Sequence, residues 1–138
     1  MAQVHETVVI NAPAAEVWAL AGELGRIHEW VPVLADARAE NGERSCTTQD
    51  GQQVVERVLE HSDEQRFYTY EIVESPFPLR SYVSGISVGG HDDHTHVDWY
   101  ADLEGETPEA EAELVAAFTQ LYRDGLDTLR ARFEEVRA

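Results

Sequence analysis

The sequence of 138 residues contains no lysine, a single cysteine and no long apolar run. Without a lysine amine, catalysis through a lysine Schiff base is excluded. Cys46 cannot form a disulfide within the chain, which fits a reducing compartment. The chain opens without a charged-then-apolar leader, and no segment approaches the roughly 20 apolar residues of a membrane helix. We therefore expect a cytoplasmic protein.

Basic residues are also scarce. The sequence contains ten arginines and 27 acidic residues, so the formal net charge is −17. Such a charge repels phosphate backbones and anionic lipid headgroups, so neither nucleic acid nor a membrane surface is an expected partner. A phosphate-binding glycine motif is missing as well, because Val88-Gly89-Gly90-His91 lacks the later glycine and the following helix. The sequence therefore predicts no nucleotide and no other cofactor.

The length and a hydrophobic content of 43% predict one domain over residues 1–138. Gln3–Ile10 has the pattern of a first strand, and Asn11-Ala12-Pro13 is typical of a helix start. A second short helix is expected over Arg26–Trp30. Thr107-Pro108-Glu109 begins a long helix, which apolar residues at helical spacing extend to the C-terminus.

Between residues 33 and 104 the sequence has the pattern of six strands joined by short turns. The turn signals are clusters of glycine, proline and short polar residues at Asn41-Gly42, Asp50-Gly51, Ser62-Asp63-Glu64, Pro76-Phe77-Pro78 and Gly89-Gly90. Short connections between consecutive strands favour an antiparallel meander. In the last strand, alternation predicts that the core face carries Val97, Trp99, Ala101 and Leu103.

Residue clusters along nearly the whole chain support a more specific prediction. They are Ala12-Pro13-Ala14-Ala15-Glu16-Val17-Trp18, Trp30-Val31-Pro32, Gly51 with Val54-Val55-Glu56-Arg57, Phe67–Ile72, Pro76-Phe77-Pro78, Tyr82, Trp99, Tyr122, Gly125-Leu126 and Leu129. Together they resemble the START-like (SRPBCC) superfamily, and its bacterial polyketide cyclase/dehydrase branch most closely. The resemblance implies an α+β helix-grip fold, in which a curved antiparallel sheet of seven strands is combined with two short helices and one long C-terminal helix.

The same resemblance implies an internal pocket for a hydrophobic small molecule. Members of the superfamily cyclise or dehydrate polyketides, carry lipids, sense hormones or only bind small molecules. Three functions therefore stay open: an enzyme similar to polyketide cyclases and dehydratases, a non-catalytic carrier or sensor, and an interaction module whose cavity is too small to matter. The oligomeric state is open too and includes a homodimer.

Glu56 is the main candidate for chemistry. It shares one strand face with Val54 and Val58. If that face is the concave one, as the resemblance implies, the carboxylate points into an apolar cavity. Burial would raise its pKa and suit general acid/base work, whereas a nearby cation would keep it ionised. The alternative role is a buried ion pair with Arg44.

The register of the hairpin around Asp50-Gly51 decides whether these two charges meet. A plain two-residue turn places Ser45 directly opposite Glu56. A glycine bulge shifts the pairing by one residue and turns Arg44 and Cys46 inward. The sequence leaves both registers open.

Further candidate site residues come from strand alternation and from the resemblance. Tyr82, which the resemblance places in the pocket, is a candidate hydrogen-bond donor in catalysis, with packing as its alternative role. His28, in the second short helix, is a candidate acid/base group or a surface histidine. The candidate ligand contacts are Trp30, Tyr70, Ser84, Trp99, Leu121 and Gly125.

Gly125 lies on the apolar stripe of the long helix. A glycine within a helix costs about 1 kcal/mol relative to alanine. Its presence there indicates either a close approach of another element or space left for a ligand.

His91-Asp92-Asp93-His94-Thr95-His96 resembles a metal-binding cluster but has the composition of a hairpin tip. Alternation places His94 and His96 on the solvent side, and no other ligand completes a site of the usual spacing. The sequence predicts no metal site.

Overall fold

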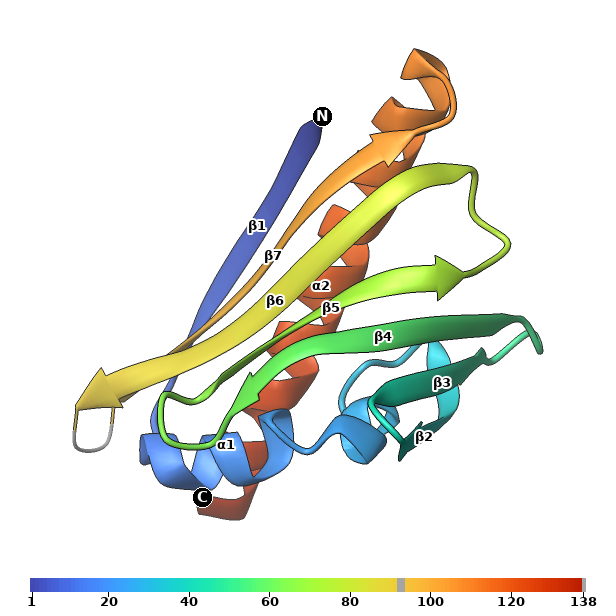
Figure 1. The fold of residues 1–138 in the computed structure, drawn as a ribbon. Helices are drawn as coiled ribbons and strands as arrows, with labels where there is room; N and C mark the ends of the chain where they lie inside the picture. Colours follow the sequence, from blue (N-terminus) through green and yellow to red (C-terminus); the bar gives the residue numbers. More distant parts are fainter. Residues whose placement is uncertain (92–93, 138) are drawn as a thin grey trace.

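The computed structural model describes residues 1–91 and 94–137. Within these residues, seven strands and three helical segments follow one another (Figure 1). The strands are β1 (Ala2–Ile10), β2 (Leu34–Glu40), β3 (Glu43–Thr48), β4 (Gln53–Ser62), β5 (Phe67–Glu74), β6 (Leu79–His91) and β7 (His94–Gly105). The helices are α1 (Ala14–Ala21), the 3₁₀ helix η1 (Leu24–Glu29) and α2 (Pro108–Arg137).

The described strands form one antiparallel sheet in the order β1-β7-β6-β5-β4-β3-β2. From β2 to β7 each strand pairs with the next, so short turns suffice for these connections. The first strand instead pairs with the last, with Val4 opposite Ala101 and Val8 opposite Val97. The predicted antiparallel meander is confirmed.

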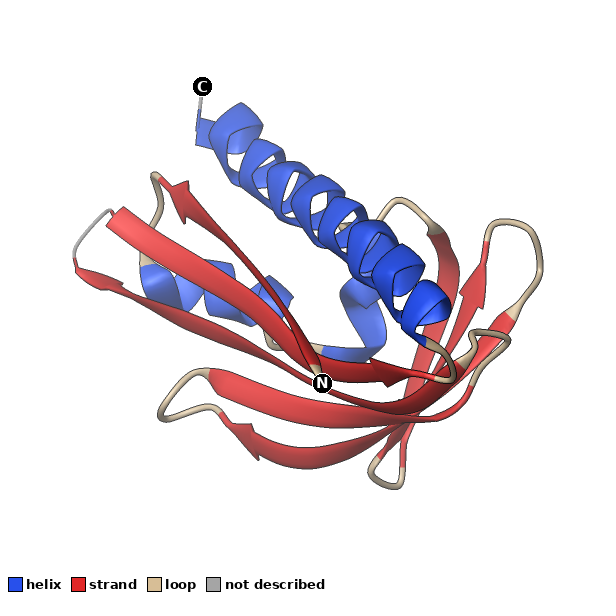
Figure 2. Ribbon diagram, turned by 90° about the horizontal axis from the view of Figure 1, so that it is seen from above, coloured by secondary structure: helices blue, strands red, loops and turns tan. Residues whose placement is uncertain are grey.

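The long helix α2 lies across the concave face of the curved sheet, as Figure 2 shows. Its first turn is capped by Thr107, whose hydroxyl accepts a hydrogen bond from the backbone N–H of Ala110 at 3.0 Å. The buried stripe of the helix consists of Leu114, Phe118, Tyr122, Leu126 and Leu129. Because these residues recur every three or four positions, they form one apolar face that packs on the sheet. The helix-grip fold is therefore confirmed.

The core lies between this helix and the inner face of the sheet. On β7 the inward residues are Val97, Trp99, Ala101 and Leu103, and each is at most 2% exposed. The alternation predicted for this strand is therefore correct. Burying a large apolar side chain contributes about 1.5–3 kcal/mol, so a shift by one residue would be strongly unfavourable. No helix in the described part of the chain combines the length and apolar character needed to cross a membrane.

The turn between β3 and β4 is a three-residue loop that contains a glycine bulge. Thr48 N–H donates to the Gln52 carbonyl at 2.9 Å, and Gly51 N–H donates to the Thr48 carbonyl at 3.0 Å. Gly51 has φ of +88°, which glycine adopts without a steric penalty. In this register Arg44 lies opposite Glu56. Of the two registers that the sequence left open, the chain therefore has the bulged one.

Candidate ligand-binding cavity

A cavity of about 80 Å³ lies between α2 and the concave face of the sheet. Most of its wall is apolar and consists of Ile27, Val31, Val33, Leu34, Val54, Ile72, Phe77, Phe118 and Leu121. Side chains with polar atoms complete the wall, namely Cys46, Thr48, Glu56, Tyr70, Tyr82, Trp99 and Tyr122. Every strand from β2 to β7 contributes to it, together with η1 and α2. Such a site exists only once the whole sheet has closed over the helix.

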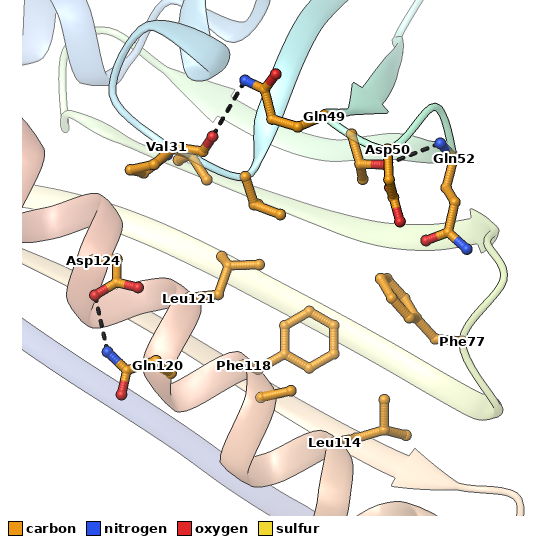
Figure 3. A pocket seen from close by; sticks show the side chains of 14 residues that line it. Val31, Gln49, Asp50, Gln52, Phe77, Leu114, Phe118, Gln120, Leu121 and Asp124 are labelled. Atoms are coloured by element: carbon orange, nitrogen blue, oxygen red, sulfur yellow. Dashed lines mark hydrogen bonds between the residues drawn. The ribbon is translucent and has the colours of Figure 1, made fainter.

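The cavity continues outward into a groove of about 550 Å³. The residues that border both spaces are Val31, Val33, Thr48, Phe77, Phe118 and Leu121. Figure 3 shows the apolar side chains of α2 on one side of the groove and the polar side chains of the β3–β4 loop, Gln49, Asp50 and Gln52, on the other. An apolar floor with a few polar groups is typical of sites for small ligands.

Glu56 and Arg44 form a buried ion pair at the cavity. Nε of Arg44 donates to Oε1 of Glu56 at 2.6 Å, and the side chains of Arg44 and Glu56 are 1% and 10% exposed, respectively. Nη1 of Arg44 donates to the Tyr68 hydroxyl at 3.0 Å and to the Leu24 carbonyl at 3.4 Å. The guanidinium also lies 4.9 Å from the centroid of the Tyr70 ring. Among the described residues Arg44 is the one hydrogen-bond partner of the carboxylate, so Oε2 is left for a molecule in the cavity.

The two members of this pair keep each other charged. Burial raises the pKa of Glu56, and the guanidinium of Arg44 opposes that rise. Burial works to lower the pKa of Arg44, but Glu56, together with Tyr68, Tyr70 and Cys46, raises that pKa well above its usual value. Neutralising Glu56 would leave a buried cation without compensation, which is strongly unfavourable. At neutral pH the Glu56 side chain is therefore a carboxylate.

A second polar cluster, the hydroxyl chain, consists of Trp99, Tyr70, Tyr82, Tyr122 and Ser84. Nε1 of Trp99 donates to the Tyr70 hydroxyl at 3.2 Å, which lies 3.4 Å from the Tyr82 hydroxyl. The Tyr82 hydroxyl is hydrogen-bonded to that of Tyr122, which lies 3.1 Å from Oγ of Ser84. The rings of Trp99 and Tyr122 also stack, with centroids 4.0 Å apart and planes 10° apart. The hydroxyl chain thus connects β5, β6, β7 and α2.

The tyrosines of the hydroxyl chain are neutral at physiological pH. Burial raises the pKa of Tyr70, Tyr82 and Tyr122 well above the usual value for tyrosine. An ionised phenol would lose its hydration in this environment without a cation directly bonded to its oxygen. These side chains therefore act as hydrogen-bonding groups and not as bases.

Part of the predicted site is brought together on the cavity wall. The residues placed there are Glu56, Tyr70, Tyr82, Trp99 and Leu121. They come from four adjacent strands and from α2, and all were expected to face inward. Their roles in binding or catalysis stay predictions.

Two other predicted contacts, Trp30 and Gly125, do not line this cavity. Trp30 packs edge-on against Trp99, with 5.4 Å between ring centroids, and so supports the wall from behind. A Cβ at Gly125 would lie 3.1 Å from the Trp99 ring and 3.3 Å from Val31. Of the two interpretations of this glycine, the structure therefore favours the close approach of another element over space for a ligand.

Ser84 and His28 also lie away from the cavity wall. Ser84 is 1% exposed and lies behind Tyr122, to which its hydroxyl is bonded. It is not among the residues that line the cavity. His28 lies on η1, half-buried, and is not among the residues that line the cavity or the groove. The structure thus places neither side chain on the cavity wall, and the predicted roles, ligand contact for Ser84 and acid/base catalysis for His28, stay predictions.

Phe77, Phe118 and Tyr122 line the cavity although the sequence analysis did not single them out as site residues. Phe118 and Tyr122 are four residues apart on the buried face of α2, one turn above the other. That spacing, which already predicted an inward-facing stripe, was the signal for both. Phe77 lies between two prolines in the β5–β6 loop, where no periodic pattern applies.

The histidine-rich hairpin tip is only partly described. His94 and His96 are exposed, as alternation predicts. Asp92 and Asp93 lie outside the described residues. Among the residues that are described, no three His, Cys, Asp or Glu side chains lie close enough to hold a metal ion.

Comparison with solved structures shows the same fold in several proteins. XoxI from Bacillus cereus is 27% identical with a TM-score of 0.92, and the match covers 100% of this chain and 99% of that chain. The Zhui aromatase/cyclase from a Streptomyces species is 14% identical with a TM-score of 0.85, covering 99% and 96% of the two chains. A START superfamily protein from Mycobacterium smegmatis is 12% identical with a TM-score of 0.81, covering 97% and 98%. At these last two identities the likeness concerns the fold alone.

Comparison of the sequence itself is more specific. Among curated proteins, none matches the chain significantly. Residues 1–134, however, match the family described as polyketide cyclase/dehydrase and lipid transport. This match spans all strands and nearly all of α2, including both polar clusters of the cavity. The chain therefore belongs to the polyketide cyclase/dehydrase and lipid transport family.

Proposed function

We propose that this chain binds a small apolar molecule, with its body in the groove and its inner end in the cavity. The observation that carries the proposal is that an apolar groove of about 550 Å³ opens into a buried cavity of about 80 Å³. The groove has the size of known ligand sites, roughly 300–1,000 Å³. Phe77, Phe118 and Leu121 border both spaces, so one ligand can occupy them together.

Burial of the ligand supplies most of the affinity in this proposal. Each ligand methylene that leaves water contributes about 0.8 kcal/mol, whereas the few polar groups of the wall orient the molecule. The family description includes lipid transport, which also supports binding of an apolar molecule. Non-catalytic binding, as in a carrier or a sensor, is therefore our first candidate.

A reaction similar to that of polyketide cyclases or dehydratases is the second candidate. Glu56 favours it, because a carboxylate whose pKa is raised by burial can act as a general base at a cavity wall. Arg44 weakens this role by holding the carboxylate ionised and in place. Burial raises the pKa of the wall tyrosines and raises that of the Cys46 thiol to about 12. Since His28 does not line the cavity, no described wall residue offers Glu56 a partner that titrates near neutral pH.

The binding proposal is tested with the neutral fluorescent probe N-phenyl-1-naphthylamine. We expect saturable binding to the wild-type protein. Ala117→Trp should weaken it about tenfold or more, because Ala117 is exposed on α2 and lines the groove. Ala116→Trp is the matched control, since Ala116 is also exposed on α2 but is not among the residues that line the groove or the cavity. Equal affinity in the two variants, or no saturable binding to the wild-type protein, would contradict the proposal.

The two candidate functions are separated by the natural ligand. Native mass spectrometry of protein purified from its own host would detect a bound molecule, and incubation would show whether its mass changes. Loss of a water mass on incubation favours the enzyme, and an unchanged ligand favours the carrier or sensor. A cytoplasmic location and a homodimer stay proposals, which cell fractionation and sedimentation would test.

A further inference from the structure

We propose that the cavity is a hydrogen-bond acceptor site, which selects apolar ligands carrying an O–H or N–H group over ligands whose polar group is a carbonyl or a carboxylate. This inference rests on the proposed function, since it assumes that the cavity holds a ligand. It follows from tracing where each side-chain proton on the cavity wall is used. It also departs from the expectation that Tyr82 donates to a ligand.

The direction of the hydroxyl chain is determined first at Ser84. Oγ of Ser84 lies 2.7 Å from the carbonyl oxygen of Tyr100, which can only accept, so Ser84 donates its proton there. A hydroxyl has a single proton, so Ser84 must accept at its 3.1 Å contact with Tyr122, and Tyr122 must donate. Tyr122 then has no proton left, so Tyr82 is the donor in the hydrogen bond between these two phenols.

The opposite end of the hydroxyl chain gives the same direction. The indole N–H of Trp99 can only donate, and Tyr70 accepts it at 3.2 Å. The proton of Tyr70 is directed at the oxygen of Tyr82, 3.4 Å away, because the Tyr82 proton is already used on Tyr122. All donors therefore point from Trp99 toward Ser84. The hydrogen bond between Tyr70 and Tyr82 is the longest in the hydroxyl chain. The Tyr70 hydroxyl is therefore the one that can most easily redirect its hydrogen bond.

The remaining polar side chains that line the cavity provide no strong donor either. Two buried donors nearby, Nη2 of Arg44 and Nε1 of Trp30, have no partner among the described residues, but neither Arg44 nor Trp30 lines the cavity. The hydroxyl of Thr48 donates to the carboxylate of Asp50. Glu56 is ionised and can only accept, and one of its oxygens has no partner among the described residues. The thiol of Cys46 is a weak donor. The strongest unused hydrogen-bonding group that the described wall offers is thus an acceptor.

This arrangement discriminates between ligand classes. A ligand hydroxyl or amine N–H can donate to the free oxygen of Glu56, and hydrogen bonds to a charged acceptor are about twice as strong as neutral ones. A ligand carbonyl would be buried without a donor, which is unfavourable. A ligand carboxylate would in addition meet the like charge of Glu56. Phenols, alcohols and amines on an apolar body therefore fit the cavity best.

The first test measures the affinity of three probes that share one apolar body, by isothermal titration calorimetry at neutral pH. The probes are 2-naphthol, which has a donor, 2-acetonaphthone, which has only an acceptor, and naphthalene. We expect 2-naphthol to bind about tenfold or more tighter than 2-acetonaphthone, the effect of one hydrogen bond to a charged group. Equal or tighter binding of 2-acetonaphthone would overturn this inference while leaving the proposed function standing. Binding of none of the three would contradict both.

The second test reverses the hydroxyl chain without touching the cavity wall. Ser84→Ala removes the acceptor of Tyr122, so Tyr122 can donate to Tyr82 and Tyr82 to Tyr70, which frees the Tyr70 proton for a ligand. We expect the preference for 2-naphthol over 2-acetonaphthone to fall about threefold or more. Ser87→Ala, on the same strand but outside the hydroxyl chain, should keep the wild-type preference.

If a folded Ser84→Ala variant kept the wild-type preference for 2-naphthol, the donor direction that we assign to the hydroxyl chain would be wrong. Tyr122→Phe provides a second measurement, because it removes the acceptor of Tyr82 and frees the Tyr82 proton instead. A preference that falls in this variant supports the inference, and a preference that stays at the wild-type value overturns it.

Discussion

Two polar clusters reach the cavity wall, and they differ in charge and in how the fold assembles them. The ion pair of Arg44 and Glu56 forms within one hairpin, between residues 12 positions apart. The hydroxyl chain is neutral and joins three strands to α2, with Tyr82 and Tyr122 40 positions apart. A single turn therefore brings the charges together, whereas the hydroxyls meet only after the helix has docked on the sheet.

The difference has an energetic consequence. An unpaired buried charge costs about 3–5 kcal/mol, whereas an unpaired buried hydroxyl costs about 1–3 kcal/mol. Damage to the ion pair should therefore destabilise the fold more than damage to the hydroxyl chain, although the hydroxyl chain contains more groups. The following predictions test this order.

Glu56→Gln should have the largest effect, a loss of about 3–5 kcal/mol in the free energy of unfolding, because it leaves the charge of buried Arg44 uncompensated. Urea denaturation measures it. Glu60→Gln, exposed on the same strand, should change stability by less than about 0.5 kcal/mol. Replacing both partners, Arg44→Met with Glu56→Leu, should restore part of the loss. A Glu56→Gln variant as stable as the Glu60→Gln control would show that the pair does not hold the fold together.

Tyr82→Phe should have a smaller effect, about 1–3 kcal/mol, because it leaves the proton of Tyr70 without an acceptor in a buried site. Tyr100→Phe is the control, since Tyr100 lies on the outward face of β7 and is 37% exposed. The same urea experiment applies. The comparison between the clusters would fail if Tyr82→Phe proved as damaging as Glu56→Gln.

Gly51→Ala tests the β3–β4 turn, whose register places Arg44 opposite Glu56. At φ of +88° a side chain is strained, and we expect a loss of about 1–2 kcal/mol. Gly25→Ala is the control, because a Cβ at Gly25 would meet its nearest neighbour, the backbone N of Ala39, at an ordinary 3.8 Å. If Gly51→Ala were neutral, the bulge would not depend on glycine, and another constraint would have to set the register.

Alkaline pH should reduce the contribution of the hydroxyl chain to stability. In the folded state, burial raises the pKa of Tyr70, Tyr82 and Tyr122 well above the usual value for tyrosine, about 10. The folded state then binds more protons than the unfolded state, so their contribution to stability is complete below about pH 10 and is lost as pH rises above it. Urea denaturation across this range, with tyrosinate absorbance followed in parallel, checks the sign. Ionisation of these phenols in the folded protein near pH 10 would contradict it.

Much of the fold could be predicted because its signals are local. Alternation along β7 depends only on the two-residue period of a strand, and the stripe of α2 depends only on the helical period. The long helix was expected to begin at Thr107-Pro108-Glu109 and extend to the C-terminus, and it runs over Pro108–Arg137. The inward positions of Glu56, Tyr70 and Tyr82 follow from the same periodicity once the concave face is identified.

The contacts within the site could not be predicted from the sequence, because they join segments that are far apart along the chain. A pattern within one segment says nothing about its neighbours from other segments. Whether Arg44 meets Glu56 depended on a shift of one residue, and both registers satisfied the sequence. Trp30 and Gly125 have the inward position of cavity residues, but they pack behind Trp99, because the space next to a side chain is set by its neighbours from other elements. The direction in which the hydrogen bonds run from Trp99 to Ser84 likewise depends on distances between β5, β6, β7 and α2. Periodicity within each segment thus determined which side chains point inward, and packing between segments decided which of them meet each other and which meet the cavity.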